Sequence, residues 1–282
     1  MSIIISLSSI PPRFDKIGQT LESLLDQSVK ADEIRLYIPK TYARFPDYDG
    51  HLPEVPEGVT IYQPDVDYGP ASKSLHCIKD KSLDPDTKIM FCDDDEIYDH
   101  NWVANFVEHS EEYPDCALCG SALLLDDYNG IVRNYTPDEL PRAKLFPKKL
   151  GGLYRIYLFF RILRQQGLQK ALKTKLSRPL FRKSGYEDIF EGFAGVMVRP
   201  RFFTDEVFDI PEIGRFQDDI WLSANVTANG FKIRVVSKQL RPTFSEAEAR
   251  NPLKHATFDG NDRFDINDKL IAYCQNKFGI WK

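Results

Sequence analysis

Four consecutive acids, from Asp93 to Glu96, directly follow the apolar residues "IMFC" in the stretch "IMFCDDDEIY". Carboxylates this close disfavour one another's ionised forms unless a cation neutralises them. Because hard cations prefer carboxylate oxygens, Asp93, Asp94 and Asp95 predict a divalent metal site at the end of a buried strand. A calcium-binding hand is disfavoured, since the twelve residues from Asp93 have no glycine at position six and no glutamate at position twelve. A solvated strand end is the alternative.

Charge is distributed unevenly along the 282 residues, although the formal net charge is only -5. Residues 140–186 contain thirteen lysines or arginines and no acid, so the rest of the chain is strongly acidic. With 42% hydrophobic and 12% aromatic residues, the composition is that of a folded domain and not of a disordered chain. The asymmetry predicts a polyanionic partner for the basic segment.

Strands and helices that alternate along the chain must position these acids. The alternation predicts a doubly wound, mostly parallel α/β sheet, in which ligands bind at the carboxyl ends of strands. The acids follow the fourth predicted strand, and the last 45 residues are mixed and polar without a predicted element. The predicted strands cover residues 3–9, 33–39, 59–64, 87–95, 116–125, 193–200 and 231–237, and the predicted helices cover 14–27, 102–113 and 218–230.

Five features occur in a fixed order: a "SIPPRF" turn after the first strand, a "DYGPASK" loop after the third, the aspartate triplet, a small-residue strand in "EGFAGVMV", and "DDIWL". In this order they resemble the GT-A fold of nucleotide-sugar glycosyltransferases. The resemblance extends over residues 1–135 and 187–237. It implies one Rossmann-like domain over residues 1–282, with 140–186 as a basic helical insertion.

In that family the D-x-D acids bind manganese or magnesium, which bridges the two phosphates of the donor. By resemblance, Asp95 is the main metal ligand, Asp93 faces the metal or the ribose, and Asp94 contacts the sugar. The metal would stabilise the charge that gathers on the diphosphate as the glycosidic bond breaks. His255, in "NPLKHATF", lies where many of these enzymes keep a late metal-binding histidine. A purely structural histidine is the alternative.

The loop "DVDYGPASKS" matches the nucleotide-binding position of the family. Gly69 permits an unusual backbone turn, and Lys73 would reach the base or the diphosphate as a point charge. Asp65 or Asp67 would accept a hydrogen bond from a uracil N–H. Arg13, in the turn after the first strand, is placed to line the same pocket. A plain surface turn is the alternative for the loop.

The segment "QDDIWL" resembles the E-D-x-x-L signature of inverting family-2-type transferases, with Asp218 in place of the glutamate. The resemblance implies that Asp219 takes the proton of the acceptor hydroxyl while Asp218 orients the acceptor. The departure from E-D leaves the choice between the two open, and an ordinary helix cap is the alternative. Glu187 and Asp188 form a rival pair, but they precede the small-residue strand, whereas the family's base follows it.

The basic segment 140–186 mixes bulky apolar residues with arginines and lysines, as does a helix lying in the plane of an anionic membrane. Neighbouring aromatic residues favour a membrane over a nucleic acid, and a helix packed on the main domain is the alternative. No secretion signal or spanning helix is predicted, so we expect a cytoplasmic enzyme bound peripherally to the inner face of the cytoplasmic membrane. The apolar positions are Leu153, Ile156, Phe160, Leu163 and Leu168.

The sequence therefore predicts a metal-dependent inverting glycosyltransferase that moves a sugar from a nucleotide donor, in the first place UDP, to a hydroxyl of a cell-surface glycan or lipid-linked acceptor. A metal-dependent phosphatase or phosphotransferase is one alternative, although its first acid normally lies on the opening strand. A catalytically inactive module that binds glycans or membranes is another. Only the transferase releases nucleoside diphosphate in proportion to glycosylated acceptor.

Overall fold

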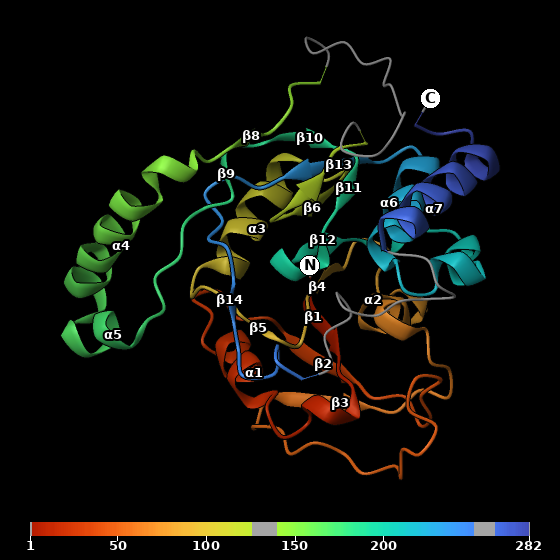
Figure 1. Ribbon diagram of the computed structural model, residues 1–282, viewed down its shortest axis with the longest axis horizontal. Helices are drawn as coiled ribbons and strands as arrows, with labels where there is room; N and C mark the ends of the chain where they lie inside the picture. The colour runs from red at the N-terminus through yellow and green to blue at the C-terminus, as the bar shows by residue number, and fades with distance from the viewer. Residues whose placement is uncertain (1, 126–139, 251–262, 282) are drawn as a thin grey trace.

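A computed structural model describes residues 2–125, 140–250 and 263–281. In these ranges a mixed α/β fold is built on a central eight-stranded sheet with the order β10-β13-β6-β12-β4-β1-β2-β3 (Figure 1). The pairs from β4 to β3 and the pair β13–β6 are parallel, while β12 and β10 run antiparallel to their neighbours. The strands are β1 Ile3–Ser8, β2 Glu33–Tyr37, β3 Val59–Tyr62, β4 Lys88–Phe91, β6 Cys116–Cys119, β10 Gly185–Glu187, β12 Val196–Val198 and β13 Lys232–Val235.

Helices cover both faces of this sheet, as the alternating apolar strands require. Successive residues of a strand point to opposite faces, so Ile4 and Ile5 of β1 enter two different cores. One core holds α2 and α6, and the other holds α1 and α3. The described helices are α1 Gly18–Leu25, α2 Ser72–Lys79, α3 Trp102–Glu112, α4 Gly151–Gln166, α5 Leu168–Lys173, α6 Asp218–Ala228 and α7 Arg263–Phe278.

Three two-stranded ribbons supplement the main sheet. They pair β7 Ala122–Leu123 with β11 Ile189–Phe190, β5 Glu96–Ile97 with β14 Thr243–Phe244, and β8 Lys144–Leu145 with β9 Phe181–Lys183. The β5–β14 ribbon carries the end of the acidic cluster.

Two expectations from the sequence need correction. The single strand expected over 116–125 is divided, because Gly120 packs so closely on Ala194 that a Cβ there would lie 2.5 Å from a carbonyl oxygen. The chain turns at that point and continues as β7 in a separate ribbon. The polar C-terminal region, for which no element was expected, contains α7, whose Leu270 and Ile271 pack with Trp221 of α6.

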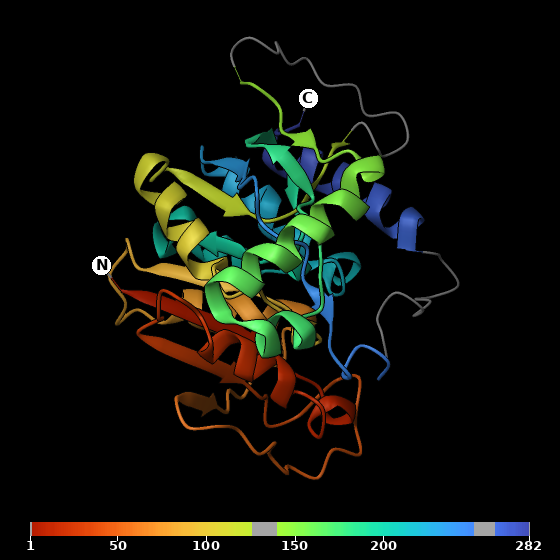
Figure 2. The same cartoon turned by 90° about the vertical axis from the view of Figure 1, so that its left-hand side faces the viewer.

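The basic segment forms α4 and α5, which project from one side of the main body (Figures 1 and 2). Leu158 and Ile162 of α4 pack on Ala171 of α5 and on Leu240, which forms a small core separate from the two sheet cores. The segment is therefore helical, as expected, and one of its faces packs on the rest of the chain.

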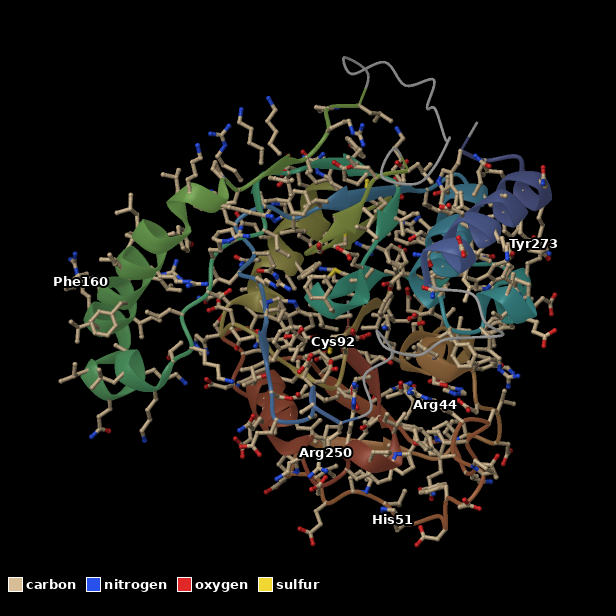
Figure 3. All side chains as sticks on the ribbon, in the orientation of Figure 1. Arg44, His51, Cys92, Phe160, Arg250 and Tyr273 are labelled. Carbon is tan, nitrogen blue, oxygen red and sulfur yellow. The ribbon has the colours of Figure 1, made fainter. Side chains whose placement is uncertain are left out.

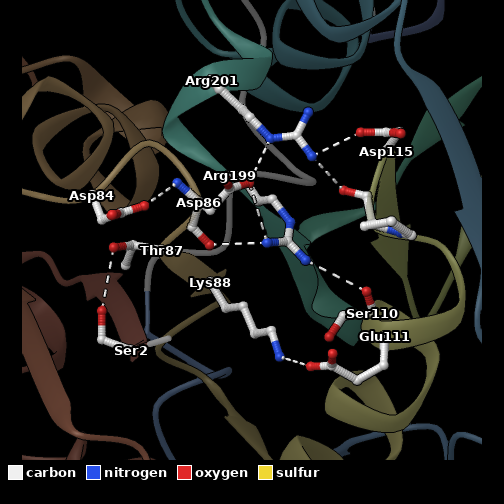
Figure 4. A network of polar contacts seen from close by, with 11 residues as sticks. Ser2, Asp84, Asp86, Thr87, Lys88, Ser110, Glu111, Asp115, Arg199 and Arg201 are labelled. Carbon is white, nitrogen blue, oxygen red and sulfur yellow. Dashed lines mark hydrogen bonds and ion pairs between the residues drawn. The ribbon is translucent and has the colours of Figure 1, made fainter.

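A polar network closes the edge of the sheet at which β4 begins (Figure 4). Arg201 donates to the Asp86 carboxylate at 2.6 Å and to Asp115 at 2.7 Å. Arg199 is buried and donates to the backbone carbonyl of Asp86 at 3.0 Å. These contacts join the residues before β4 and β6 to the end of the antiparallel β12.

Candidate active site

A cavity of about 320 Å³ lies at the opposite edge of the sheet, where β1 and β4 end. Because β12 runs antiparallel to β4, the residues that precede β12 come to this same edge, and Phe193 lines the cavity. The carboxyl ends of strands in open α/β sheets are where ligands bind, and cavities of roughly 300–1,000 Å³ accommodate small molecules. We call this space the reaction cavity.

The reaction cavity brings together most residues that the sequence singled out. Asp65 is an exception, because its exposed carboxylate pairs with Lys40 at 2.6 Å and does not line the cavity. His255 lies outside the described residues. The lining includes the predicted residues Arg13, Asp67, Gly69, Lys73, Asp93, Asp94, Asp95, Asp218 and Asp219.

Arg13 organises one end of the acidic cluster. The 3-10 turn Pro11–Arg13 after β1 brings its buried guanidinium against Asp94 and, at 2.9 Å, against Asp95. Ser9 donates to the second oxygen of Asp94, so both carboxylate oxygens of that buried residue have partners. Asp94 thus holds Arg13 in place, and the predicted contact with a sugar would require it to exchange partners.

The acids beyond Asp94 are incompletely neutralised. Burial, followed by the charges of Asp94 and Asp93, raises the pKa of Asp95 to about 7, against the opposing effect of Arg13. Burial and the Asp95 charge raise the pKa of Glu96 to about 8. An added cation would favour the ionised form of Asp95, so this end of the cluster has the electrostatics of a cation site.

Lys73 connects the acidic cluster to the start of α6. It lies in the first turn of α2, and its buried ammonium contacts Asp93 at 2.6 Å and Asp218 at 3.0 Å. Burial acts to lower the pKa of Lys73, but Asp218 and Asp93 raise it well above the ordinary value. Lys73 is therefore a fixed positive charge between two carboxylates, and its predicted contact with a base or diphosphate stays a prediction.

Asp219 faces the cavity next to this ion pair. Its Oδ1 accepts a hydrogen bond from the backbone N–H of Gly192 at 3.0 Å. Gly192 does not belong to α6, so this bond is not a cap of that helix. A Cβ at Gly192 would lie 2.7 Å from Lys73 Nζ and 3.2 Å from Asp219 Oδ1, so a larger residue there would displace the Lys73 ammonium. Burial and the neighbouring Asp218 raise the pKa of Asp219 well above its usual value.

The loop before α2 has the expected unusual backbone. Gly69 has a φ of +60°, and a Cβ at this position would lie 3.1 Å from the Arg215 carbonyl oxygen. Asp67 accepts from the backbone N–H of Gly69 at 2.8 Å and of Ala43 at 3.0 Å. Its carboxylate therefore ties two loops of the cavity wall together, and the hydrogen bond to uracil stays a prediction.

Several lining residues were missed from the sequence. Arg215 and Phe216 directly precede "QDD", so their proximity to Asp218 was a usable signal. The others come from loops without a recognisable pattern, one after β2 and one around β14. They are Tyr42, Arg44, Phe45, Arg241, Phe244 and Glu248.

The residues present fit a magnesium or manganese ion that is shared with a ligand. Eight carboxylates and five basic side chains line the cavity. Because negative charges are in excess, the cavity would repel an anionic ligand unless a cation were bound with it. Within the described ranges, no three His, Cys, Asp or Glu side chains converge on a metal position. Magnesium is commonly held by only one or two carboxylates together with substrate phosphates, and Asp95 and Asp93 supply such a pair.

Comparison with known proteins gives structural neighbours at low identity. Residues 1–349 of S. aureus TarS in complex with UDP-GlcNAc are 13% identical, with 99% of this chain and 73% of that chain covered and a TM-score of 0.45. The same fragment in complex with UDP is 14% identical, with 86% and 60% covered and a TM-score of 0.43. This chain thus spans 60% of that second structure. No family model and no curated protein matches the sequence.

Proposed function

We propose that the protein is a metal-dependent inverting glycosyltransferase that moves a sugar from a UDP-sugar to a hydroxyl of a cell-surface glycan or lipid-linked acceptor. One observation carries the proposal. The acidic cluster after β4 and the Asp219 carboxylate at the start of α6 line the same cavity at the carboxyl edge of the sheet. Candidate ligands for a cation and a candidate base thus line one space, which supports a single displacement of the diphosphate.

Asp95 and Asp93 would hold the manganese or magnesium ion. When bound, the ion would stabilise the negative charge of the diphosphate leaving group. The raised pKa of Asp95 supports this assignment, because a nearby divalent cation offsets the repulsion that keeps the carboxylate from ionising. Arg13 contacts Asp95 at 2.9 Å and Lys73 contacts Asp93 at 2.6 Å, so both proposed ligands would be oriented before a donor arrives.

Asp219 would accept the proton of the acceptor hydroxyl. A general base works best when its pKa lies near the working pH, and burial and Asp218 move the pKa of Asp219 in that direction. Asp218 is buried and forms an ion pair with Lys73 at 3.0 Å, so it is assigned the role of orienting the acceptor. The Gly192 N–H holds the Asp219 carboxylate toward the cavity.

A phosphatase is not favoured by any feature of the cavity. Phosphatases of the D-x-D type use an aspartate at the end of the opening strand as nucleophile, whereas β1 ends here at Ser8 and is followed by Ser9. Ser9 is buried and donates to Asp94. The transferase assignment uses the acids where the structure has them.

Donor binding and turnover test the proposal. Thermal unfolding with UDP, GDP or dTDP, each with and without manganese, should show the largest increase in midpoint for UDP with manganese. A ligand at about 100 times its Kd stabilises the folded state by about 2.7 kcal/mol. Release of UDP from a matching UDP-sugar, in proportion to glycosylated acceptor, would identify a transferase. Release of inorganic phosphate would identify a phosphatase, and binding without any turnover would identify an inactive module.

We further propose that the enzyme binds an anionic membrane through α4. Leu153, Ile156, Tyr157 and Phe160 expose more than half of their surface, and Figure 3 shows Phe160 on the projecting helix, far from the labelled Cys92 that follows β4. Exposed arginines on the same helix would contact acidic headgroups. None of the helices within the described ranges has the length and hydropathy required to span a bilayer.

Vesicle flotation tests the membrane proposal. The double variant Ile156→Ser and Phe160→Ser should reduce partitioning onto phosphatidylglycerol vesicles by about ten-fold, because two apolar side chains no longer enter the interface. Leu52→Ser is the matched control, since Leu52 is exposed but lies in a distant loop. Equal flotation of both variants and the wild type would show that α4 does not bind membranes.

A further inference from the structure

A second cavity, of about 600 Å³, lies between the α4–α5 hairpin and the main body. Its walls come from α1, from residues 97–101, from both hairpin helices and from residues 240–243. Figure 2 shows the hairpin lying across this side of the molecule. We call this space the hairpin cavity. Nothing in the proposed chemistry uses it.

The β5–β14 ribbon separates the two cavities. Thr243 pairs with Ile97 and Phe244 pairs with Glu96, and neighbouring residues of a strand point to opposite sides. Accordingly, Glu96 and Phe244 line the reaction cavity, whereas Ile97 and Thr243 line the hairpin cavity. Arg241 lines both. A ligand in the hairpin cavity is therefore one thin ribbon away from the proposed site of glycosyl transfer.

The two walls of the hairpin cavity carry opposite charges. The two hairpin helices, Lys175 and Arg241 contribute the cations, while α1 with its C-cap and the turn after β5 contribute the carboxylates of Glu22, Asp26 and Asp99. The floor is apolar, formed by Leu158 and Ile162. The cations are Arg161, Lys170, Lys173, Lys175 and Arg241.

Two of these cations already have partners. Lys170 pairs with Asp26 at 3.0 Å across the mouth of the cavity, and Lys175 donates to the Phe244 carbonyl oxygen at 2.8 Å. Arg161 and Lys173, in contrast, form no ion pair with any other described residue. They come from different helices and border one space, so together they provide donors for a group with several acceptor oxygens.

We propose that the hairpin cavity binds a phosphorylated sugar, with the phosphate at Arg161 and Lys173. Hydroxyl groups would donate to Glu22 and Asp99 on the facing wall, since ionised carboxylates only accept hydrogen bonds. The apolar floor suits the C–H face of a sugar. Resting on the proposed function, this site would hold the anionic portion of the acceptor while its reacting hydroxyl extends past the ribbon to Asp219.

The binding part of the proposal is tested without turnover. Isothermal titration in metal-free buffer at constant ionic strength would compare α-D-glucose 1-phosphate with glucose and with inorganic phosphate. The double variant Arg161→Gln and Lys173→Gln should weaken glucose 1-phosphate binding about ten-fold, as expected for lost charge-assisted hydrogen bonds. The matched control, Arg155→Gln and Arg164→Gln, removes two exposed cations of α4 that do not line the cavity and should stay within two-fold of wild type.

A charge-preserving variant, Arg161→Lys, should retain most of the affinity. Equal weakening in the site variant and the control would reduce the effect to general electrostatic attraction and overturn the proposal. Unchanged binding in the site variant, or no preference for glucose 1-phosphate over glucose, would also overturn it. Because no catalysis is involved, an enzyme that fails to transfer sugar can still pass this test, and an active transferase can still fail it.

Vesicle flotation distinguishes a lipid headgroup from a soluble or polymer-borne phosphate as the ligand. If a lipid headgroup fills the cavity, the site variant floats less on phosphatidylglycerol vesicles than the control does, and glucose 1-phosphate displaces the wild type. If a soluble or polymer-borne phosphate is the ligand, both variants lose flotation equally while only the site variant loses glucose 1-phosphate binding. Either result supports a phosphate site in the hairpin cavity.

Discussion

The pKa values of acidic residues shift in opposite directions at the two edges of the central sheet. At the edge where β4 begins, hydrogen bonding to Arg201 lowers the pKa of Asp86. At the edge where β4 ends, burial and neighbouring acids raise the pKa of Asp95 to about 7. Both acids lie a few residues from the same four-residue strand. The first edge is neutralised within the chain and serves stability, whereas the second holds an excess of carboxylates that a cation and a ligand can complete.

Among the variants that test this comparison, Asp219→Asn should have the largest effect, and that effect should be on turnover. Asp219→Asn keeps the size of the side chain but removes the proton acceptor, so turnover should fall at least 100-fold, at the lower end of general-base contributions. Donor affinity should stay within a few-fold, because Asp95, Arg13 and Lys73 are unchanged. Single-turnover kinetics and UDP titration measure the two quantities.

The anomeric configuration of the product and the variant Asp218→Asn further test the assignment of Asp219 as the base. With Asp219 as base, the wild-type product should have the anomeric configuration opposite to that of the donor, as measured by NMR of the anomeric proton. An active Asp219→Asn enzyme alongside an inactive Asp218→Asn enzyme would move the base by one residue. Retained configuration would eliminate the single-displacement mechanism.

The next largest effect concerns metal-dependent donor binding. Asp95→Asn should abolish the increase in unfolding midpoint that manganese and UDP produce together, because the main ligand of the cation is lost. Asp86→Asn is the matched control, since it removes one acid from the other end of β4. It should keep the full ligand-induced increase even though its starting midpoint is lower. A wild-type response in Asp95→Asn would refute the metal assignment.

A smaller effect is expected for stability at the neutralised edge. Asp86→Asn weakens the contacts with Arg201 and Arg199 and should lower the free energy of unfolding by about 1 kcal/mol, a value reduced for the partial exposure of Asp86. Asp65→Asn breaks an equally short pair with Lys40 in which both partners are exposed, so it should change stability less than Asp86→Asn does. Urea unfolding measures both. Equal losses would show that burial does not distinguish the two pairs.

Sequence patterns predicted the parts of this molecule that are set locally. Short, largely apolar runs such as "IIISLS" and "KIMF" are typical of buried strands, and the acids after the second run were recognisable because nothing in a strand end requires them. Gly69 was predictable from the backbone freedom that the loop needs, and its φ of +60° confirms this.

Pairings between distant segments were not predictable in the same way. Nothing near Lys73 in the sequence indicates that its ammonium lies between Asp93 and Asp218. The ribbon between β5 and β14 joins residues almost 150 positions apart, and it brings Arg241 and Phe244 to the cavity wall. Such contacts depend on tertiary packing, which a single sequence does not reveal without the fold. The exposed apolar face of α4 was predictable from its composition, but the cavity beneath the hairpin was not.

The last expected effect, of similar size to that of Asp86→Asn, lies on α2, which carries Lys73 at the reaction cavity and His76 further along the helix. Burial, with a contribution from Lys79, lowers the pKa of His76 to about 4, and its ring lies between those of Tyr37 and Tyr68. In the unfolded chain the pKa returns to about 6.5. Unfolding therefore takes up a proton when the pH falls below about 6.5, so the stabilisation that is complete above this pH is lost progressively toward pH 4.

His76→Phe keeps an aromatic ring between the two tyrosines and removes the titration. Between pH 7 and pH 5 the wild type should lose about 1 kcal/mol more than the variant, a value reduced because the ring is not fully buried. Urea unfolding at the two pH values measures the difference. Parallel losses in both proteins would show that His76 does not titrate on unfolding and would assign the acid sensitivity of α2 to another group.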